Sequence, residues 1–85
     1  MNPERSSQIT IRFFQAVDIL KQTKEIRGLQ TITRSWDINR RNLQRVKANP
    51  EKYPIKVEYL ARMVLDYNIS AHWLLTGIGE IRGVK

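Results

Sequence analysis

The stretch ITRSWDINRRNLQRV, residues 32–46, spaces its apolar side chains in the way that decides the fold. Two short helices joined by a turn after Trp36 would bring all of them to one inner face: Ile32, Trp36, Ile38, Leu43 and Val46. Asp37 falls in the turn, and an aspartate tolerates left-handed backbone better than most residues. Asn39 can cap the following helix with its side-chain oxygen. The spacing therefore predicts a helix-turn-helix.

The same geometry leaves a polar set outside, made of long cations and amides. Arginine can donate two hydrogen bonds to guanine, and asparagine or glutamine can pair with adenine. The second helix of such a unit, here about residues 39–48, enters the major groove of DNA with its N-terminal residues against the bases. We therefore expect base reading by Asn39, Arg40, Arg41 and Gln44. Cations and polar groups around them are expected to contact phosphates: Arg27, Gln30, Thr31, Arg34, Asn42, Arg45 and Lys47.

The charge is concentrated around this stretch. The chain of 85 residues has 15 Lys and Arg against 8 Asp and Glu, a net charge of +7. Residues 24–47 hold seven basic and two acidic residues, which gives +5 of that total. A basic domain suits a polyanionic partner such as double-stranded DNA. The alternative for a run such as RRNLQR is a solvated helix face without a partner, but the agreement of charge and apolar spacing favours DNA.

Helical periodicity extends to both sides. An apolar stripe predicts a first helix that Ser6 or Ser7 caps and that ends near Thr23: Ile9, Phe13, Ala16, Val17 and Leu20. Gln30 or Thr31 should open the next short helix. A fourth helix carries the stripe Val57, Leu60, Ala61 and Val64.

Local signals complete the layout. Asn68 should end the fourth helix in a left-handed conformation, Ser70 should cap a fifth helix at 71–75, and Gly77 should end it. The expected fold is an all-α, compact five-helix domain at residues 9–77. An N-terminal arm at 1–8 and a C-terminal tail at 78–85 are expected to flank it.

Little in the composition suggests catalysis. The chain has no cysteine and one histidine, His72, which we interpret as a surface imidazole, so we expect no enzyme, metal site or cofactor. Trp36 and Trp73 lie on apolar stripes and are expected in the core. No apolar run approaches the ~18 residues of a membrane helix, and the start lacks a secretory signal. We therefore expect a cytoplasmic protein, with no membrane contact and no evident small-molecule effector.

Two segments resemble the phage-repressor and Cro-type helix-turn-helix family, the xenobiotic-response-element type. One is TITRSWDINRRNLQRV, residues 31–46, and the other is NISAHWLLTGIGEI, residues 68–81. The run WLLTG at 73–77 is the more specific, and the likeness covers roughly residues 9–81. Departures are Thr33 in place of the family's usual alanine, Asp37 in place of a glycine, and Leu29 where a glutamine often opens the second helix.

The resemblance implies a lambda-repressor-like fold and sequence-specific DNA binding. It also implies transcriptional regulation, usually as a repressor and a homodimer on a palindromic site, in a prokaryotic or phage setting at the nucleoid. The alternative is a protein-interaction adaptor, such as an antitoxin-like partner with the same fold. An exposed apolar face around Leu74, Leu75, Ile78 and Ile81 would fit the adaptor, and it would equally serve a homodimer.

Overall fold

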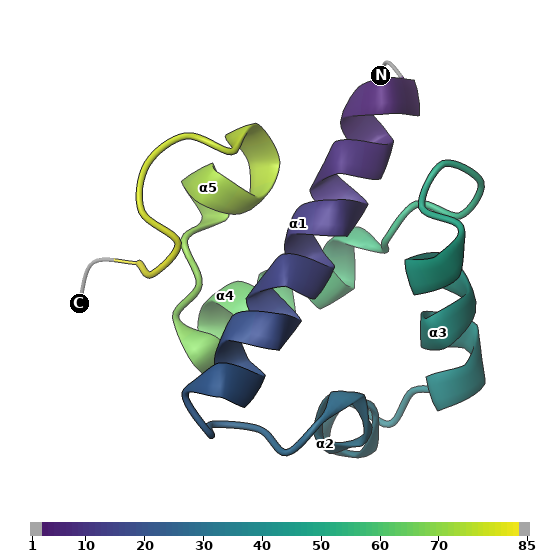
Figure 1. Cartoon of the computed structure of the whole chain (residues 1–85), viewed down its shortest axis with the longest axis vertical. Coiled ribbons are helices and arrows are strands. Elements are labelled where there is room, and N and C mark those ends of the chain that lie inside the picture. Colours follow the sequence, from purple (N-terminus) through teal and green to yellow (C-terminus); the bar gives the residue numbers. More distant parts are fainter. Residues whose placement is uncertain (1–2, 84–85) are drawn as a thin grey trace.

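The computed structural model describes the backbone of residues 3–83 and the side chains from Ser6 onward, and this part of the chain is helical with no strand beyond one isolated bridge. The helices are α1 (Pro3–Gln22), α2 (Leu29–Ser35), α3 (Arg40–Ala48), α4 (Val57–Tyr67) and α5 (Ala71–Thr76). Figure 1 shows α1 crossing the molecule, with α5 on one side of it and α3 on the other. The prediction of five helices in an all-α domain is confirmed.

Helix α1 supplies the central apolar surface. All five residues of its predicted stripe are buried, and Phe13 and Leu20 are fully enclosed. The prediction that Ser6 or Ser7 caps this helix is wrong, because α1 already begins at Pro3. Proline suits the first helical position, where its fixed φ is helical and the missing N–H would have no partner.

The predicted signals end α4 and both begin and end α5, but the start of α2 differs from the prediction. Helix α2 starts at Leu29, one residue before the predicted Gln30. Asn68 ends α4 in the left-handed region at φ 56°, and Gly77 ends α5 at φ 76°. The Ser70 hydroxyl accepts a hydrogen bond from the backbone N–H of Trp73. Each of these residues bonds to, or sets the angles of, the backbone within a few positions of itself. Such signals therefore operate largely independently of the rest of the fold.

Two polar residues of α1 fasten distant segments to it. The hydroxyl of Thr10, which is fully buried, accepts a hydrogen bond from the backbone N–H of Ile55 at 3.0 Å. The guanidinium of Arg12 donates to the carbonyls of Leu74 and Leu75, at 2.8 and 3.1 Å. These carbonyls lie at the C-terminal end of α5, where backbone acceptors lack helical partners. Through these bonds α1 fixes both the loop before α4 and the end of α5.

The segment predicted as a tail returns to the domain. The Ser70 N–H donates to the carbonyl of Ile81, and the N–H of Gly83 donates to that of Asn68, both at 2.7 Å. Arg82 forms an ion pair with Glu25 and donates to the carbonyl of Tyr67. Residues 81–83 are thus bonded across the connection between α4 and α5. In the predicted arm, residues 3–8 are helical; residues 1, 2, 84 and 85 lie outside the described part of the chain.

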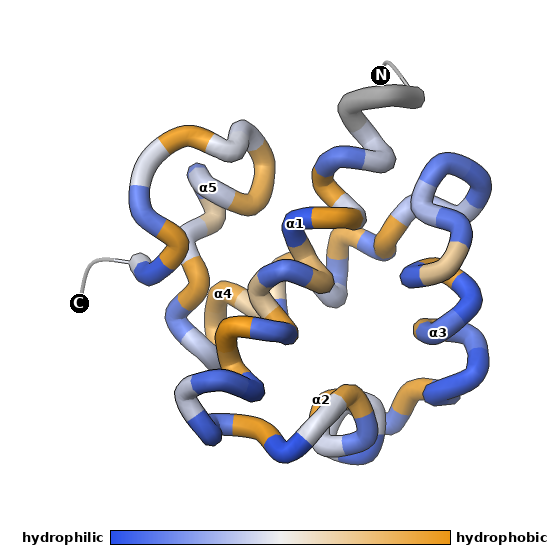
Figure 2. The backbone as a smooth tube through the Cα atoms, in the orientation of Figure 1, coloured by the Kyte–Doolittle hydropathy of each residue, from blue (hydrophilic) through white to orange (hydrophobic). Residues whose placement is uncertain are grey.

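Polar and apolar residues separate by element. In Figure 2 the tube of α3 is mostly hydrophilic, with the hydrophobic colour limited to short inner segments. The predicted core positions Trp36 and Trp73 are both buried, and His72 is exposed, as predicted. None of the described helices is both long and apolar enough to span a membrane.

Candidate nucleic-acid interface

Helices α2 and α3 are joined by a tight turn at residues 36–39. Asp37 adopts the left-handed region at φ 54°, as its place in the turn predicts. Its neighbour Ile38 donates its backbone N–H to the carbonyl of Thr33 at 2.9 Å. The buried Thr33 hydroxyl is satisfied by the carbonyl of Gln30, so threonine fits this small position without an unpaired polar atom.

The predicted inner face of this unit is confirmed. Ile32, Trp36 and Leu43 are buried, and Ile38 and Val46 are half-buried against the core. Helix α3 therefore rests on the domain by two side chains one turn apart, Leu43 and Val46. Its remaining surface is free to face a partner.

Trp36 anchors the turn to the rest of the molecule. Its indole N–H donates to a carboxylate oxygen of Asp66 at 2.9 Å. Its ring stacks on Tyr59 with centroids 6.1 Å apart, and it contacts Phe13 and Tyr67 at 6.2 and 6.4 Å. Aromatic pairs in this range add stability beyond their buried area. The turn, and with it the start of α3, is thus held by α1 and α4 together.

The outer face of α3 is cationic, and its arginines form no ion pair with any other described side chain. Arg41, Gln44 and Ala48 follow one another at three- and four-residue spacing, which places them on the face opposite Leu43. Every residue of α3 except Leu43 and Val46 is exposed, and the first turn holds no acid. The one ion pair among the described side chains joins Arg82 to Glu25, on another part of the surface. The arginines of α3 are therefore available to an external anion.

One of the predicted contact residues, Asn39, is engaged in a hydrogen bond within the protein. The Asn39 side-chain oxygen accepts a hydrogen bond from the backbone N–H of Asn42 at 3.2 Å, so the predicted cap is confirmed. Bidentate pairing with adenine uses both the oxygen and the NH₂ group of an amide. The cap occupies one of the two lone pairs of the Asn39 oxygen and fixes its orientation, which disfavours bidentate pairing by Asn39. Arg40, Arg41 and Gln44 carry no such internal bond.

The predicted phosphate contacts fall into two groups. Arg27, Gln30, Thr31 and Arg34 line one surface hollow beside α2, together with Ser35. The Thr31 hydroxyl accepts a hydrogen bond from the backbone N–H of Arg27, which ties the connection before α2 to the helix. The other group, Asn42, Arg45 and Lys47, is exposed along α3. The structure thus brings four predicted phosphate residues together in one place.

The sequence predicts a loop at residues 49–54, with Tyr53 as a surface aromatic near DNA, but it does not single out the lysines around it. Lys52 and Lys56 are exposed there, and each ammonium lies over a tyrosine ring, at 5.6 Å from Tyr53 and 5.7 Å from Tyr59. The signal for the two lysines was their spacing from the tyrosines, Lys52 next to Tyr53 and Lys56 three residues before Tyr59.

The described residues include no cluster of His, Asp and Glu that could hold a metal ion. No protein-family model, curated protein or solved structure matches this chain. The exposed residues of the interface are hydrogen-bond donors and cations, which suit phosphates and base edges.

Proposed function

We propose that this protein is a sequence-specific DNA-binding regulator of transcription, most simply a cytoplasmic repressor with a lambda-repressor-like fold. Helix α3 enters the major groove, and α2 lies across the phosphate backbone. The observation that carries the proposal is the unpaired cationic face of α3, which stands outward while Leu43 and Val46 hold its other side on the core.

Residue roles follow from the two sides of α3. Arg41 and Gln44 lie on the face of α3 opposite Leu43, which would face the DNA groove. Arg40 lies beside them. These three read bases, and Asn39, whose oxygen caps the helix, contributes chiefly through its NH₂ group. Arg45 and Lys47 contact DNA phosphates along α3. Arg27 and Arg34, which line the hollow beside α2, contact the phosphate backbone there.

The affinity for duplex DNA is expected to fall steeply with salt. Four predicted phosphate contacts are cations, Arg27, Arg34, Arg45 and Lys47. Release of about 0.9 counterion per contact gives a logarithmic slope near −3.6 for each protomer, or roughly 100-fold weaker binding between about 50 and about 200 mM salt. Fluorescence anisotropy with labelled duplex DNA measures this slope. Arg34→Ala should reduce its magnitude by about 1. Binding that ignores salt would contradict the proposal.

A homodimer is the second part of the proposal. One short helix reads few base pairs, so two copies are needed for useful specificity. The surface that suits a second copy is an apolar groove between α4 and α5, lined by Val57, Leu60, Ala61, Val64, Ala71, Leu74 and Leu75. Val57 is 78% exposed and Leu75 is 53% exposed. The face predicted from the sequence is only partly correct, because Leu74 is buried and Ile81 is half-buried, while Leu75 and Ile78 are exposed.

Leu75→Glu is expected to weaken the dimer by at least about tenfold, because a carboxylate cannot be buried unpaired in an apolar interface without a large cost. Leu65→Glu is the matched control, since Leu65 is 80% exposed on α4 and does not line the groove. Light scattering over a concentration series measures the dimer affinity of the two variants and of the wild type. A wild-type protein that stays monomeric both free and on DNA would exclude the dimer. A stoichiometric foreign partner on this groove, without any selected DNA sequence, would favour the adaptor function instead.

A further inference from the structure

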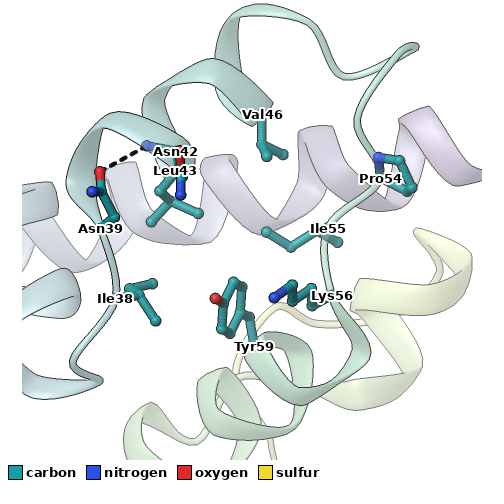
Figure 3. A pocket seen from close by; sticks show the side chains of 9 residues that line it. All are labelled: Ile38, Asn39, Asn42, Leu43, Val46, Pro54, Ile55, Lys56 and Tyr59. Carbon is teal, nitrogen blue, oxygen red and sulfur yellow. Dashed lines mark hydrogen bonds between the residues drawn. The ribbon is translucent and has the colours of Figure 1, made fainter.

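A pocket lies directly behind the recognition helix. It is bounded by α3, by residues 54–56 of the following loop, and by Tyr59 on α4. Figure 3 shows the side chains around it, with Ile38, Ile55 and Tyr59 turned toward a common centre. Helix α3 packs on α1 and α2. The side of α3 that is turned toward α4 borders this pocket.

The floor of the pocket is apolar and firmly held. Leu43 and Ile55 are buried there, and Val46 and Ile38 form its sides. The backbone of Ile55 is fixed by its hydrogen bond to the buried Thr10 hydroxyl. The pocket has a volume of about 140 Å³. An apolar cavity of about 150 Å³ accommodates a benzene molecule, so a single small ring or a short branched chain fills this one.

The mouth of the pocket is polar and has one sign of charge. The amides of Asn39 and Asn42, the ammonium of Lys56 and the Tyr59 hydroxyl surround it, and no carboxylate among the described side chains lines it. The ammonium lies over the Tyr59 ring at 5.7 Å, which keeps it at this edge (Figure 3). Hydrogen-bond donors beside a single cation favour an anionic group that accepts several hydrogen bonds.

We propose that this pocket binds a small carboxylic acid with a compact apolar body of about the size of benzoate. The ring lies against Leu43 and Ile55, and the carboxylate meets Lys56 and the Asn42 amide at the mouth.

Occupancy of the pocket would weaken DNA binding, a consequence that rests on the proposed function. Asn39 and Asn42 line the pocket and are also among the residues expected to contact DNA. A bound carboxylate therefore adds a negative charge beside the phosphates, and like charges in proximity repel. By thermodynamic reciprocity, DNA weakens the binding of the acid by the same factor.

The test is a titration of the ¹⁵N-labelled full chain with sodium benzoate at constant ionic strength, without DNA, followed by NMR. The backbone signals of Leu43, Val46, Ile55 and Tyr59 should shift together and saturate, with a dissociation constant on the order of millimolar for so small a ligand. Benzyl alcohol, which has the same ring without the charge, should bind several-fold more weakly.

Two lysine variants locate the charge effect. Lys56→Met should bring the affinities for benzoate and benzyl alcohol together. Lys52→Met removes the same charge from the same loop, also from above a tyrosine ring but outside the pocket, and should leave the preference intact. Shifts spread over the cationic surface, no saturation, or equal losses in both variants would overturn the proposal.

A second titration tests the coupling to DNA. Benzoate should lower the DNA affinity of the wild type several-fold and leave that of Lys56→Met nearly unchanged. An unchanged wild type would overturn the coupling. If the protein binds no DNA at all, the proposed function fails, whereas the NMR titration still decides the pocket by itself.

Discussion

Phe13→Ala is expected to lower the free energy of unfolding by about 3–5 kcal/mol, the usual cost of removing a fully buried phenylalanine ring. Phe13 has no exposed surface, and its ring contacts both Phe14, at 5.1 Å between centroids, and Trp36, at 6.2 Å. Its loss opens a cavity at the point where α1 supports the α2–α3 turn. Small domains have only ~5–15 kcal/mol in total, so this single change brings the protein close to unfolding at 37 °C.

Urea unfolding followed by circular dichroism measures this effect. Phe13→Leu keeps most of the volume and should cost less than about 1.5 kcal/mol. Gln15→Ala changes an exposed residue of the same helix and should stay within about 0.5 kcal/mol of the wild type. A loss under about 1 kcal/mol for Phe13→Ala would mean that this ring does not hold the core together.

Arg41→Ala is expected to weaken binding to the preferred DNA site by about 1–3 kcal/mol, or roughly 5- to 150-fold, and to relax the preference at one base position. Arg41 is exposed on the outer face of α3 and has no carboxylate partner among the described side chains. Removal of its guanidinium is therefore expected to take away the proposed base contact and to leave the packing of α3 through Leu43 unchanged.

Lys47→Ala is the matched control, because it removes a cation from the last turn of the same helix, where a phosphate contact is proposed. It should weaken binding about equally on every sequence and reduce the salt slope by about 1. Anisotropy titrations on the preferred site and on single-base variants of it compare the two proteins. If Arg41→Ala also weakened all sequences equally, direct base reading by Arg41 would be refuted.

Much of the fold could be predicted because its signals are local. Asn39, Ser70, Asn68 and Gly77 each start or end a helix through bonds or backbone angles within a few residues of themselves. The inner face of residues 32–46 was predictable for a similar reason, since helical periodicity decides which side chains share a face.

The parts of the fold that the sequence did not predict depend on contacts between distant segments. The stripe on α4 has the spacing of a core face, yet Val57 is largely exposed, and Met63 is buried in the core although it lies outside that stripe. Which side of a helix is covered is decided by its neighbours, and here α5 lies beside α4 without closing the groove. The attachment of residues 81–83 requires Arg82 to meet Glu25 across 57 positions of sequence. No local sequence pattern predicts an ion pair between residues so far apart in the chain.

The candidate site also combines features that local sequence predicts with features that depend on distant contacts. Exposure of Arg40, Arg41 and Gln44 followed from the spacing of Leu43 and Val46. The pocket behind α3 could not be predicted, because its walls come from three separate segments and its floor depends on the bond between Thr10 and Ile55. Tyr59 and Lys56 acquire their place there only when α4 folds back toward α3.

Selection of DNA from a random duplex pool by the purified wild-type chain tests the central claim most directly. We expect enrichment of one defined sequence, with two inverted copies of a short half-site about one helical turn apart. Arg41→Ala should select the same arrangement with one position in each half-site relaxed. A wild-type protein that enriches no sequence over the starting pool would contradict the assignment of α3 as a base-reading helix.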